Sequence, residues 1–105
     1  MRQKSIYLTI DDAPSSHLAE KVDFLRKEQI PAIFYCRGEY MLPHLDQLVY
    51  ALKQGFFLGN HSYTHPYFSK IDLTQARDEI LATEELLDKA YALAGAPGVM
   101  SDPFV

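Results

Sequence analysis

The chain has 105 residues, enough for about one small domain. It carries 10 basic and 14 acidic side chains, and the net charge of −4 gives no electrostatic reason to expect nucleic acid or an anionic membrane surface as a partner. Hydrophobic residues make up 48% of the chain and charged residues 23%, which is typical of globular proteins and argues against disorder and against a coiled coil.

Cysteine usage and hydropathy argue against two further classes of protein. The single cysteine cannot form an internal disulfide. No apolar run approaches the roughly 18 residues that a membrane span needs. Residues 1–7 also lack the apolar stretch and the cleavage site of a signal peptide. We therefore expect a cytoplasmic protein, unless an export signal lies outside this chain.

The first part of the chain predicts a strand, a helix and a second strand. Residues 6–10 are β-branched and aromatic, which indicates a buried strand that ends at a polar Asp-Asp loop. Residues 18–28 carry apolar side chains at helical spacing, with Ser15 or Ser16 as the N-cap. Residues 32–36, directly after a proline, form a second apolar run and predict the second strand.

The second part repeats the pattern of helix and strand. Residues 42–54 have apolar side chains at helical spacing, and Gly55 stands where a helix ends. Residues 56–60 predict a third short strand. Asp72 or Thr74 can then cap a long helix that ends before a Gly-Ala-Pro-Gly stretch.

Strands that alternate with helices through short connections predict a parallel α/β sheet built of right-handed crossovers. Three strands do not complete such a domain, since a closed (β/α) barrel usually needs about 200 residues or more. We therefore expect residues 1–105 to be the N-terminal part of a single domain, with one side of the sheet uncovered. Such a sheet has unpaired edges and predicts a homo-oligomer or poor solubility.

Polar residues follow the first and third predicted strands. Asp11 and Asp12 follow the first, and Asn60, His61 and His65 follow the third. Because the carboxyl ends of parallel strands share one rim, the topology brings these residues together, and sites in α/β proteins form at that rim.

The spacing of the two histidines suits a metal. His61 and His65 are four residues apart and can face the same way on one turn, although Pro66 makes that turn short and irregular. Two imidazoles and one carboxylate are a ligand set that zinc accepts at catalytic sites. The alternative is a pair of surface histidines in a loop.

The acidic pair also has two interpretations. An Asp at a strand end often forms a turn or caps a helix. In strand geometry, however, Asp11 and Asp12 point in opposite directions, so that one can bind a metal while the other acts as a base toward water.

Three segments in order resemble the polysaccharide deacetylases, the NodB-homology group of carbohydrate esterases. Residues 9–14, Thr-Ile-Asp-Asp-Ala-Pro, resemble the Thr-Phe-Asp-Asp-Gly-Pro motif of that family. Residues 59–66, Gly-Asn-His-Ser-Tyr-Thr-His-Pro, resemble its His-rich motif, and residues 31–39 are similar to its Pro-Ala-Thr-Phe-Phe strand. The resemblance covers nearly the whole chain, from Ser5 to about Ala94.

The resemblance implies a partial distorted (β/α) barrel of the NodB-homology type and a metal-dependent deacetylase that acts on N- or O-acetylated carbohydrates. By position, Asp11 matches the catalytic base. Asp12, His61 and His65 match the ligands of Zn²⁺ or another divalent metal. Two further residues of the His-rich motif, Ser62 and Thr64, match hydroxyl groups that brace the histidines, with simple turn capping as the alternative.

The chain departs from the family pattern at two places. Ala13 replaces a glycine after the acidic pair. The family's Arg-x-Pro-Tyr/Phe motif has its best match in residues 101–104, Ser-Asp-Pro-Phe, where Ser101 replaces the arginine. In the family, a later Leu-x-His motif supplies the general acid, and no such motif follows residues 101–104 in this chain. We therefore expect a truncated enzyme in which the chain alone binds metal and has little deacetylase activity.

Two alternatives to a carbohydrate deacetylase stay open. The chain can be a non-catalytic or degenerate metal-binding fragment, or a deacylase that acts on a small N-acyl substrate.

Several other residues have mainly structural interpretations. Cys36 is expected to be a buried small hydrophobe, and Glu84 and Glu85 to lie on the solvated face of the last helix. Tyr63 and the nearby aromatics, Tyr67 and Phe68, either stack on sugar or pack the loop.

Overall fold

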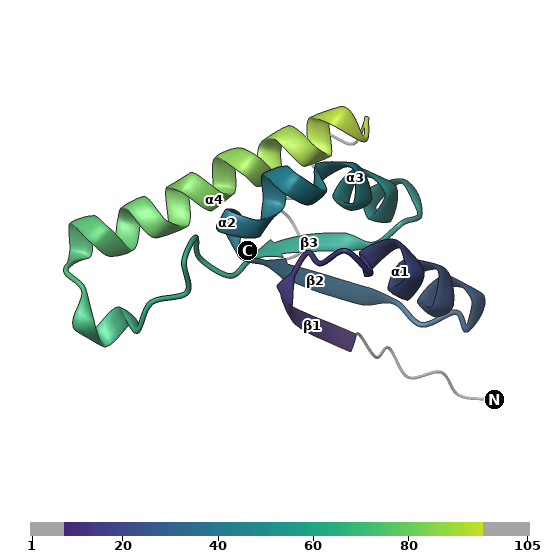
Figure 1. The fold of residues 1–105 in the computed structure, drawn as a ribbon, viewed down its shortest axis with the longest axis horizontal. Coiled ribbons are helices and arrows are strands. Elements are labelled where there is room, and N and C mark those ends of the chain that lie inside the picture. Colours follow the sequence, from purple (N-terminus) through teal and green to yellow (C-terminus); the bar gives the residue numbers. More distant parts are fainter. Residues whose placement is uncertain (1–7, 96–105) are drawn as a thin grey trace, which may run out of the picture.

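The sheet of this protein is parallel and has the strand order β1-β2-β3 (Figure 1). The structure is a computed structural model that describes residues 8–95. Its strands are β1 (Leu8–Ala13), β2 (Ala32–Cys36) and β3 (Phe57–Asn60). Helices separate the strands in sequence, so the α/β class with three parallel strands is confirmed.

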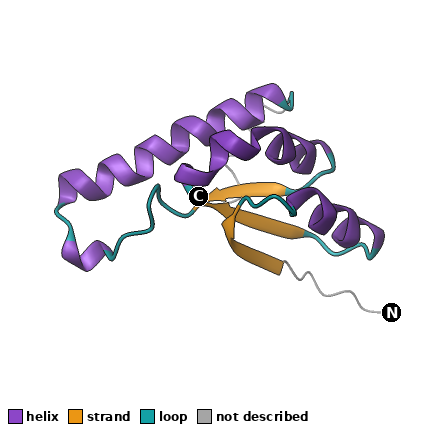
Figure 2. Cartoon of the chain, in the orientation of Figure 1, coloured by secondary structure: helices purple, strands orange, loops and turns teal. Residues whose placement is uncertain are grey.

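The helices lie together on one side of the sheet, as Figure 2 shows. Burial along β2 alternates accordingly. Phe34 and Cys36 are fully buried beneath the helices, whereas Ile33 and Tyr35 point the other way and are half-buried. At the edge of the sheet, Leu8 is 44% exposed. One side of the sheet is therefore only partly covered, as expected for an open part of a barrel.

The first strand differs from the prediction. The strand expected over residues 6–10 runs from Leu8 to Ala13, and residues 6 and 7 lie outside the described residues. Both aspartates therefore belong to the strand and not to a loop after it. The expected serine cap is also wrong, because α1 (Leu18–Lys27) begins after His17 and no side chain caps it.

The second helical segment is divided into three pieces. It consists of α2 (Gly38–Met41), a 3-10 turn (Leu42–His44) and α3 (Leu45–Lys53), where a single helix over residues 42–54 was predicted. The 3-10 turn contains Pro43 near its start, and a proline there removes an amide that a continuous helix would use. Gly55, with φ of 95°, takes the left-handed conformation expected of a residue that follows a helix.

The last helix is α4 (Leu73–Leu93), and its predicted Asp72 cap is confirmed. Asp72 accepts a hydrogen bond from the Gln75 amide at 2.8 Å, and the Gln75 side chain accepts one from the Asp72 amide at 3.1 Å. This capping box satisfies two amides that the helix itself cannot pair. Within residues 8–95, no helix is long and apolar enough to cross a membrane.

Near its other end, α4 is tied to the outer edge of β3 by a buried tyrosine. The Tyr91 hydroxyl accepts a hydrogen bond from the Leu58 amide at 2.9 Å and donates one to the Leu58 carbonyl at 3.2 Å. Both residues are about fully buried, with 1% exposure each. A single hydroxyl thus satisfies two backbone groups of an edge strand.

We predict that Tyr91→Phe lowers the free energy of unfolding by about 1–3 kcal/mol, because two buried backbone groups lose their partner. Urea denaturation measures this change. Tyr67→Phe is the matched control, since Tyr67 is 79% exposed, and it should leave stability unchanged. Equal stability of Tyr91→Phe and the wild type would contradict the role assigned to this hydroxyl.

Candidate metal centre

A bulge in β1 presents the two aspartates. Ile10 pairs with Phe34 and Ala13 with Cys36, so Asp11 and Asp12 lie opposite a single residue of β2. Asp12 has φ of 61°, in the left-handed region that Asp adopts more readily than most residues. Bulges change the direction of a side chain locally. The bulge therefore decides where the Asp12 carboxylate points.

The histidines lie on a loop, residues 61–65, which we call the histidine loop. It continues the sheet at first, because the His61 amide donates to the Cys36 carbonyl at 2.9 Å. It then turns through two left-handed residues, Ser62 with φ of 64° and His65 with φ of 61°. A helical turn that carries both histidines is therefore not formed, and the irregular turn expected from Pro66 is observed.

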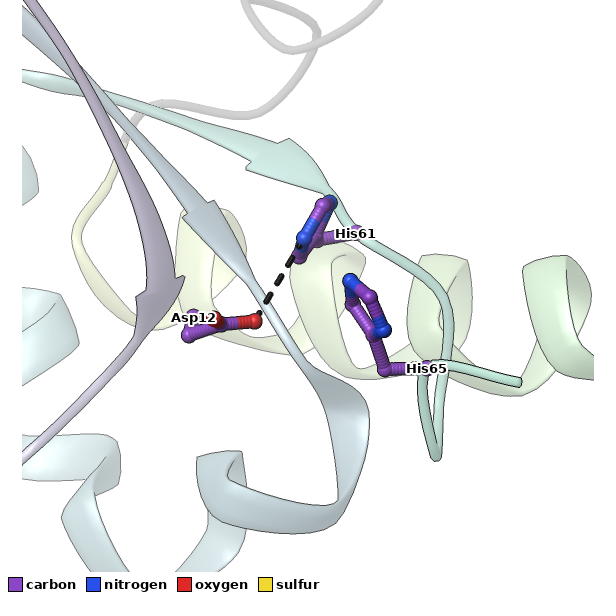
Figure 3. A group of neighbouring side chains, drawn as sticks. All are labelled: Asp12, His61 and His65. Carbon is purple, nitrogen blue, oxygen red and sulfur yellow. Dashed lines mark ion pairs between the residues drawn. The ribbon is translucent and has the colours of Figure 1, made fainter. Parts of the chain in front are cut away.

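Three predicted site residues converge at the carboxyl ends of the strands. Asp12, His61 and His65 each offer a ligand atom, and these atoms all lie within 4.8 Å of one another (Figure 3). His61 Nε2 is 3.4 Å from Asp12 Oδ1, and the two imidazole rings are 4.4 Å apart at an angle of 62°. Asp12 and His65 are exposed and His61 is half-buried, so water reaches this cluster.

The donor set fits a divalent metal. Ligand atoms on one tetrahedral zinc lie about 3.3–3.6 Å apart, given bond lengths of roughly 2.0–2.2 Å. The 3.4 Å separation of Asp12 Oδ1 and His61 Nε2 lies in this range. All three ligand atoms lie within 4.8 Å of one another, so the cluster would contract around a bound metal. One carboxylate and two imidazoles would leave positions open for water or substrate.

Asp11 is not part of this cluster. It is exposed in the bulge directly before Asp12, on the rim where the three ligand candidates meet.

The histidine loop is braced from both sides by residues outside the predicted site. The start of α2 contributes two backbone hydrogen bonds, from the Gly38 amide to the Ser62 carbonyl at 3.0 Å and from the Glu39 amide to the Tyr63 carbonyl at 3.1 Å. On the other side, α4 contributes Glu79, whose carboxylate accepts hydrogen bonds from the loop.

The pKa of Glu79 reflects these contacts. Partial burial acts to raise it, but the hydrogen bonds from Thr64 and Tyr63, together with the charge of Arg37, outweigh burial and hold the pKa of Glu79 below its usual value. The Glu79 carboxylate is therefore a charged acceptor at neutral pH.

The turn at the start of the loop depends on Asn60. Its side-chain oxygen accepts from the Ser62 amide at 2.9 Å, and its amide group donates to the Ile80 carbonyl and to the Glu84 carboxylate, both at 2.9 Å. The expectation that Glu84 lies on a solvated face is therefore wrong, whereas Glu85 is exposed as predicted. The Ser62 hydroxyl donates to the adjacent His61 carbonyl, which is local turn capping.

A pocket of about 420 Å³ lies beside the two histidines. Pro66, Phe68 and Ile80 form its apolar wall. Of the aromatics predicted either to stack on sugar or to pack the loop, Phe68 borders this pocket and Tyr63 packs against Gly38. Tyr67 is 79% exposed.

Two further predictions concern residues near the site. Cys36 is buried as expected, and burial raises the pKa of its thiol, so it behaves as a small hydrophobe. The Arg-x-Pro-like residues 101–104 lie outside the described residues. The sequence did not single out Arg37 or Glu79 as site residues. Arg37 lies in a segment that was matched only as a strand, and no motif contains Glu79.

The fold and this cluster define a parallel α/β protein with a carboxylate and two histidines at the strand ends. The sequence matches the family described as "Polysaccharide deacetylase" over residues 1–101. The chain therefore belongs to the polysaccharide deacetylase family, as its motifs suggested.

Individual relatives agree with this membership. A peptidoglycan-N-acetylglucosamine deacetylase of Bacillus cereus is 32% identical over 101 residues, which are 94% of this chain and 36% of the relative. A chitooligosaccharide deacetylase of Rhizobium leguminosarum is 32% identical over 83% of this chain and 41% of the relative. The structure of the peptidoglycan deacetylase PdaC from Bacillus subtilis matches with a TM-score of 0.79 and 31% identity, over 86% of this chain and 45% of that one. The chain thus spans less than half the length of these relatives.

We predict that Gly38→Ala displaces the histidine loop. Gly38 is buried, and an added Cβ would overlap the Tyr63 ring and lie 2.5 Å from Thr83 Oγ1. Overpacking of this kind costs about 1–3 kcal/mol. The amide resonances of residues 61–65 should shift in NMR spectra of the variant.

Gly55→Ala is the control, because it strains a left-handed residue with no atom within 4 Å of the new Cβ. It should lower stability and leave the resonances of the histidine loop unchanged. Unchanged loop resonances in Gly38→Ala would show that this close packing does not position the loop.

Proposed function

We propose that this protein is a metal-dependent hydrolase that removes acetyl groups from N- or O-acetylated carbohydrates. The observation that carries the proposal is the convergence of Asp12, His61 and His65 at the strand ends of a polysaccharide deacetylase fold. These three residues would hold Zn²⁺ or another divalent metal, and Asp11 would act as the catalytic base.

The chemistry follows from the side chains at the rim. A divalent metal held there would supply Lewis-acid polarisation and would lower the pKa of water. Asp11 is exposed beside Asp12 and can take the proton of the attacking water as a general base. The exposure of Asp12 and His65 leaves room for a polymer to approach.

The relatives indicate the substrate class. Their names specify peptidoglycan N-acetylglucosamine and chitooligosaccharide, both of which contain acetylated amino sugars. An N-acetylated carbohydrate is therefore the substrate that we propose first for this protein.

We predict that His61→Ala and His65→Ala each weaken zinc binding by about tenfold or more, since each removes one of three ligands. Competition with a chromogenic chelator measures the affinity. His17→Ala is the control, because this exposed histidine precedes α1 and pairs with Glu20. Unchanged zinc affinity and stoichiometry in both ligand variants would disprove the metal centre.

We predict that Asp11→Asn lowers the rate of acetate release by about 10²–10⁴, the usual contribution of a general base. The assay uses N-acetylated chitooligosaccharides with zinc supplied and the protein that the gene encodes, including any residues that follow Val105. Asp46→Asn, an exposed carboxylate on α3, is the control.

The outcome also separates the alternatives. Zinc binding without acetate release from any substrate would contradict the hydrolase and favour a non-catalytic metal-binding protein. Release from small N-acyl compounds alone would favour a deacylase for small substrates.

A further inference from the structure

One carboxylate on α4 accepts several hydrogen bonds from the histidine loop. Glu79 Oε1 accepts hydrogen bonds from the Tyr63 amide at 2.8 Å and from the Thr64 amide at 2.7 Å. Glu79 Oε2 accepts from the Thr64 hydroxyl at 2.7 Å. These bonds are short, as is usual when the acceptor is charged. Glu79, a residue of α4 that lies 15 positions after Thr64, thus fixes the backbone between His61 and His65.

Arg37 completes the contacts of Thr64. Its guanidinium donates to the Thr64 carbonyl at 3.1 Å, pairs with Glu39 and stacks at 4.7 Å over the Tyr40 ring. The amide, hydroxyl and carbonyl of Thr64 are therefore all bonded to side chains from outside the loop. A residue held at all three polar groups has little freedom to move.

The next residue is His65, whose backbone is strained. Its φ of 61° costs about 1–3 kcal/mol for a residue other than glycine, and such strain persists only where the surroundings impose it. The His65 side chain is exposed and contacts the ring of His61. The hydrogen bonds of Thr64 to Glu79 and Arg37 are the nearest set of contacts that can impose this conformation.

We propose that Glu79 is a positioning residue for the metal centre. Through its hydrogen bonds to Tyr63 and Thr64, Glu79 holds His65 in reach of His61 and Asp12. This inference rests on the metal site of the proposed function. Residues that orient ligands without touching the metal are typically worth about 10–100-fold in metal affinity. The loss of Glu79 should therefore weaken zinc binding although Glu79 is not itself a ligand.

The hydrogen bonds, and not the charge, carry this effect. A glutamine at this position keeps an oxygen for the two amides, and its NH₂ group can donate to the Thr64 hydroxyl. Alanine removes all three bonds. Comparison of Glu79→Gln with Glu79→Ala therefore separates the effect of the three hydrogen bonds from the effect of the negative charge.

The experiment measures two properties of the chain in Glu79→Ala and Glu79→Gln. Glu85→Gln is the matched control, an exposed carboxylate on the same helix. The first readout is zinc affinity. The second is hydrogen exchange of the Tyr63 and Thr64 amides in the metal-free protein. Both are measured well below the unfolding temperature of each variant, so that global unfolding does not contribute.

We expect Glu79→Ala to bind zinc about 10–100-fold more weakly and to lose the protection of both amides. Glu79→Gln should stay within about threefold of the wild type in affinity and keep the protection, because its three hydrogen bonds are retained. Glu85→Gln should match the wild type in both readouts.

Two results would overturn the inference. One is wild-type zinc affinity in Glu79→Ala. The other is equal amide protection in Glu79→Ala and the wild type, and this exchange readout needs no metal. Failure of the proposed metal centre is recognised separately, because it would appear as unchanged zinc affinity in His61→Ala and His65→Ala.

Discussion

The end of β2 is the point on which the site depends. There the Arg37 amide donates to the Ala13 carbonyl at 2.8 Å on one side, and the Cys36 carbonyl accepts from the His61 amide at 2.9 Å on the other. These two hydrogen bonds continue the parallel ladders by one step beyond the regular strand. They hold Ala13, which follows Asp12, and His61 at adjacent positions, Arg37 and Cys36, at the end of β2. The distance between Asp12 and His61 is therefore set by backbone pairing.

Backbone strain is concentrated at the same rim. Asp12, Ser62 and His65 all have φ near 60°, at a cost of about 1–3 kcal/mol each. Folding can tolerate this cost because the neighbouring backbone is bonded from several elements. β2 holds the bulge, the start of α2 holds the loop on one side, and α4 holds it on the other. Rigid elements thus impose on the ligand candidates a shape that the local sequence would not adopt alone.

Local patterns predicted the parts of the structure that local forces determine. The apolar run of residues 32–36 coincides with β2, and Asp72 caps α4 as expected from its side chain. The convergence of Asp12, His61 and His65 was also predictable, because parallel topology brings strand ends to one rim. The motifs of the family singled out the same three residues.

The remaining features depend on tertiary contacts. A bulge is not visible in the residues 9–14, since its cause is the register with β2. The prediction of a single helix over residues 42–54 was wrong, because the 3-10 turn with Pro43 precedes α3. The apolar side chains keep helical spacing across this turn, so their pattern did not show the break. Glu79 resembles any charged residue of an amphipathic helix. Its role is apparent only once α4 is packed against the histidine loop.

The contact of Tyr91 with β3 affects whether a further strand can pair with the sheet. The His61 amide, one residue past β3, faces β2, so the backbone groups of Leu58, an odd number of residues away, face the free edge of the sheet. The Tyr91 hydroxyl already occupies both of them. Any strand that joins the sheet beside β3 must compete for the same two groups, and α4 has to give up this contact first. At Leu58, this contact therefore disfavours pairing with a further strand, which an open edge would otherwise invite.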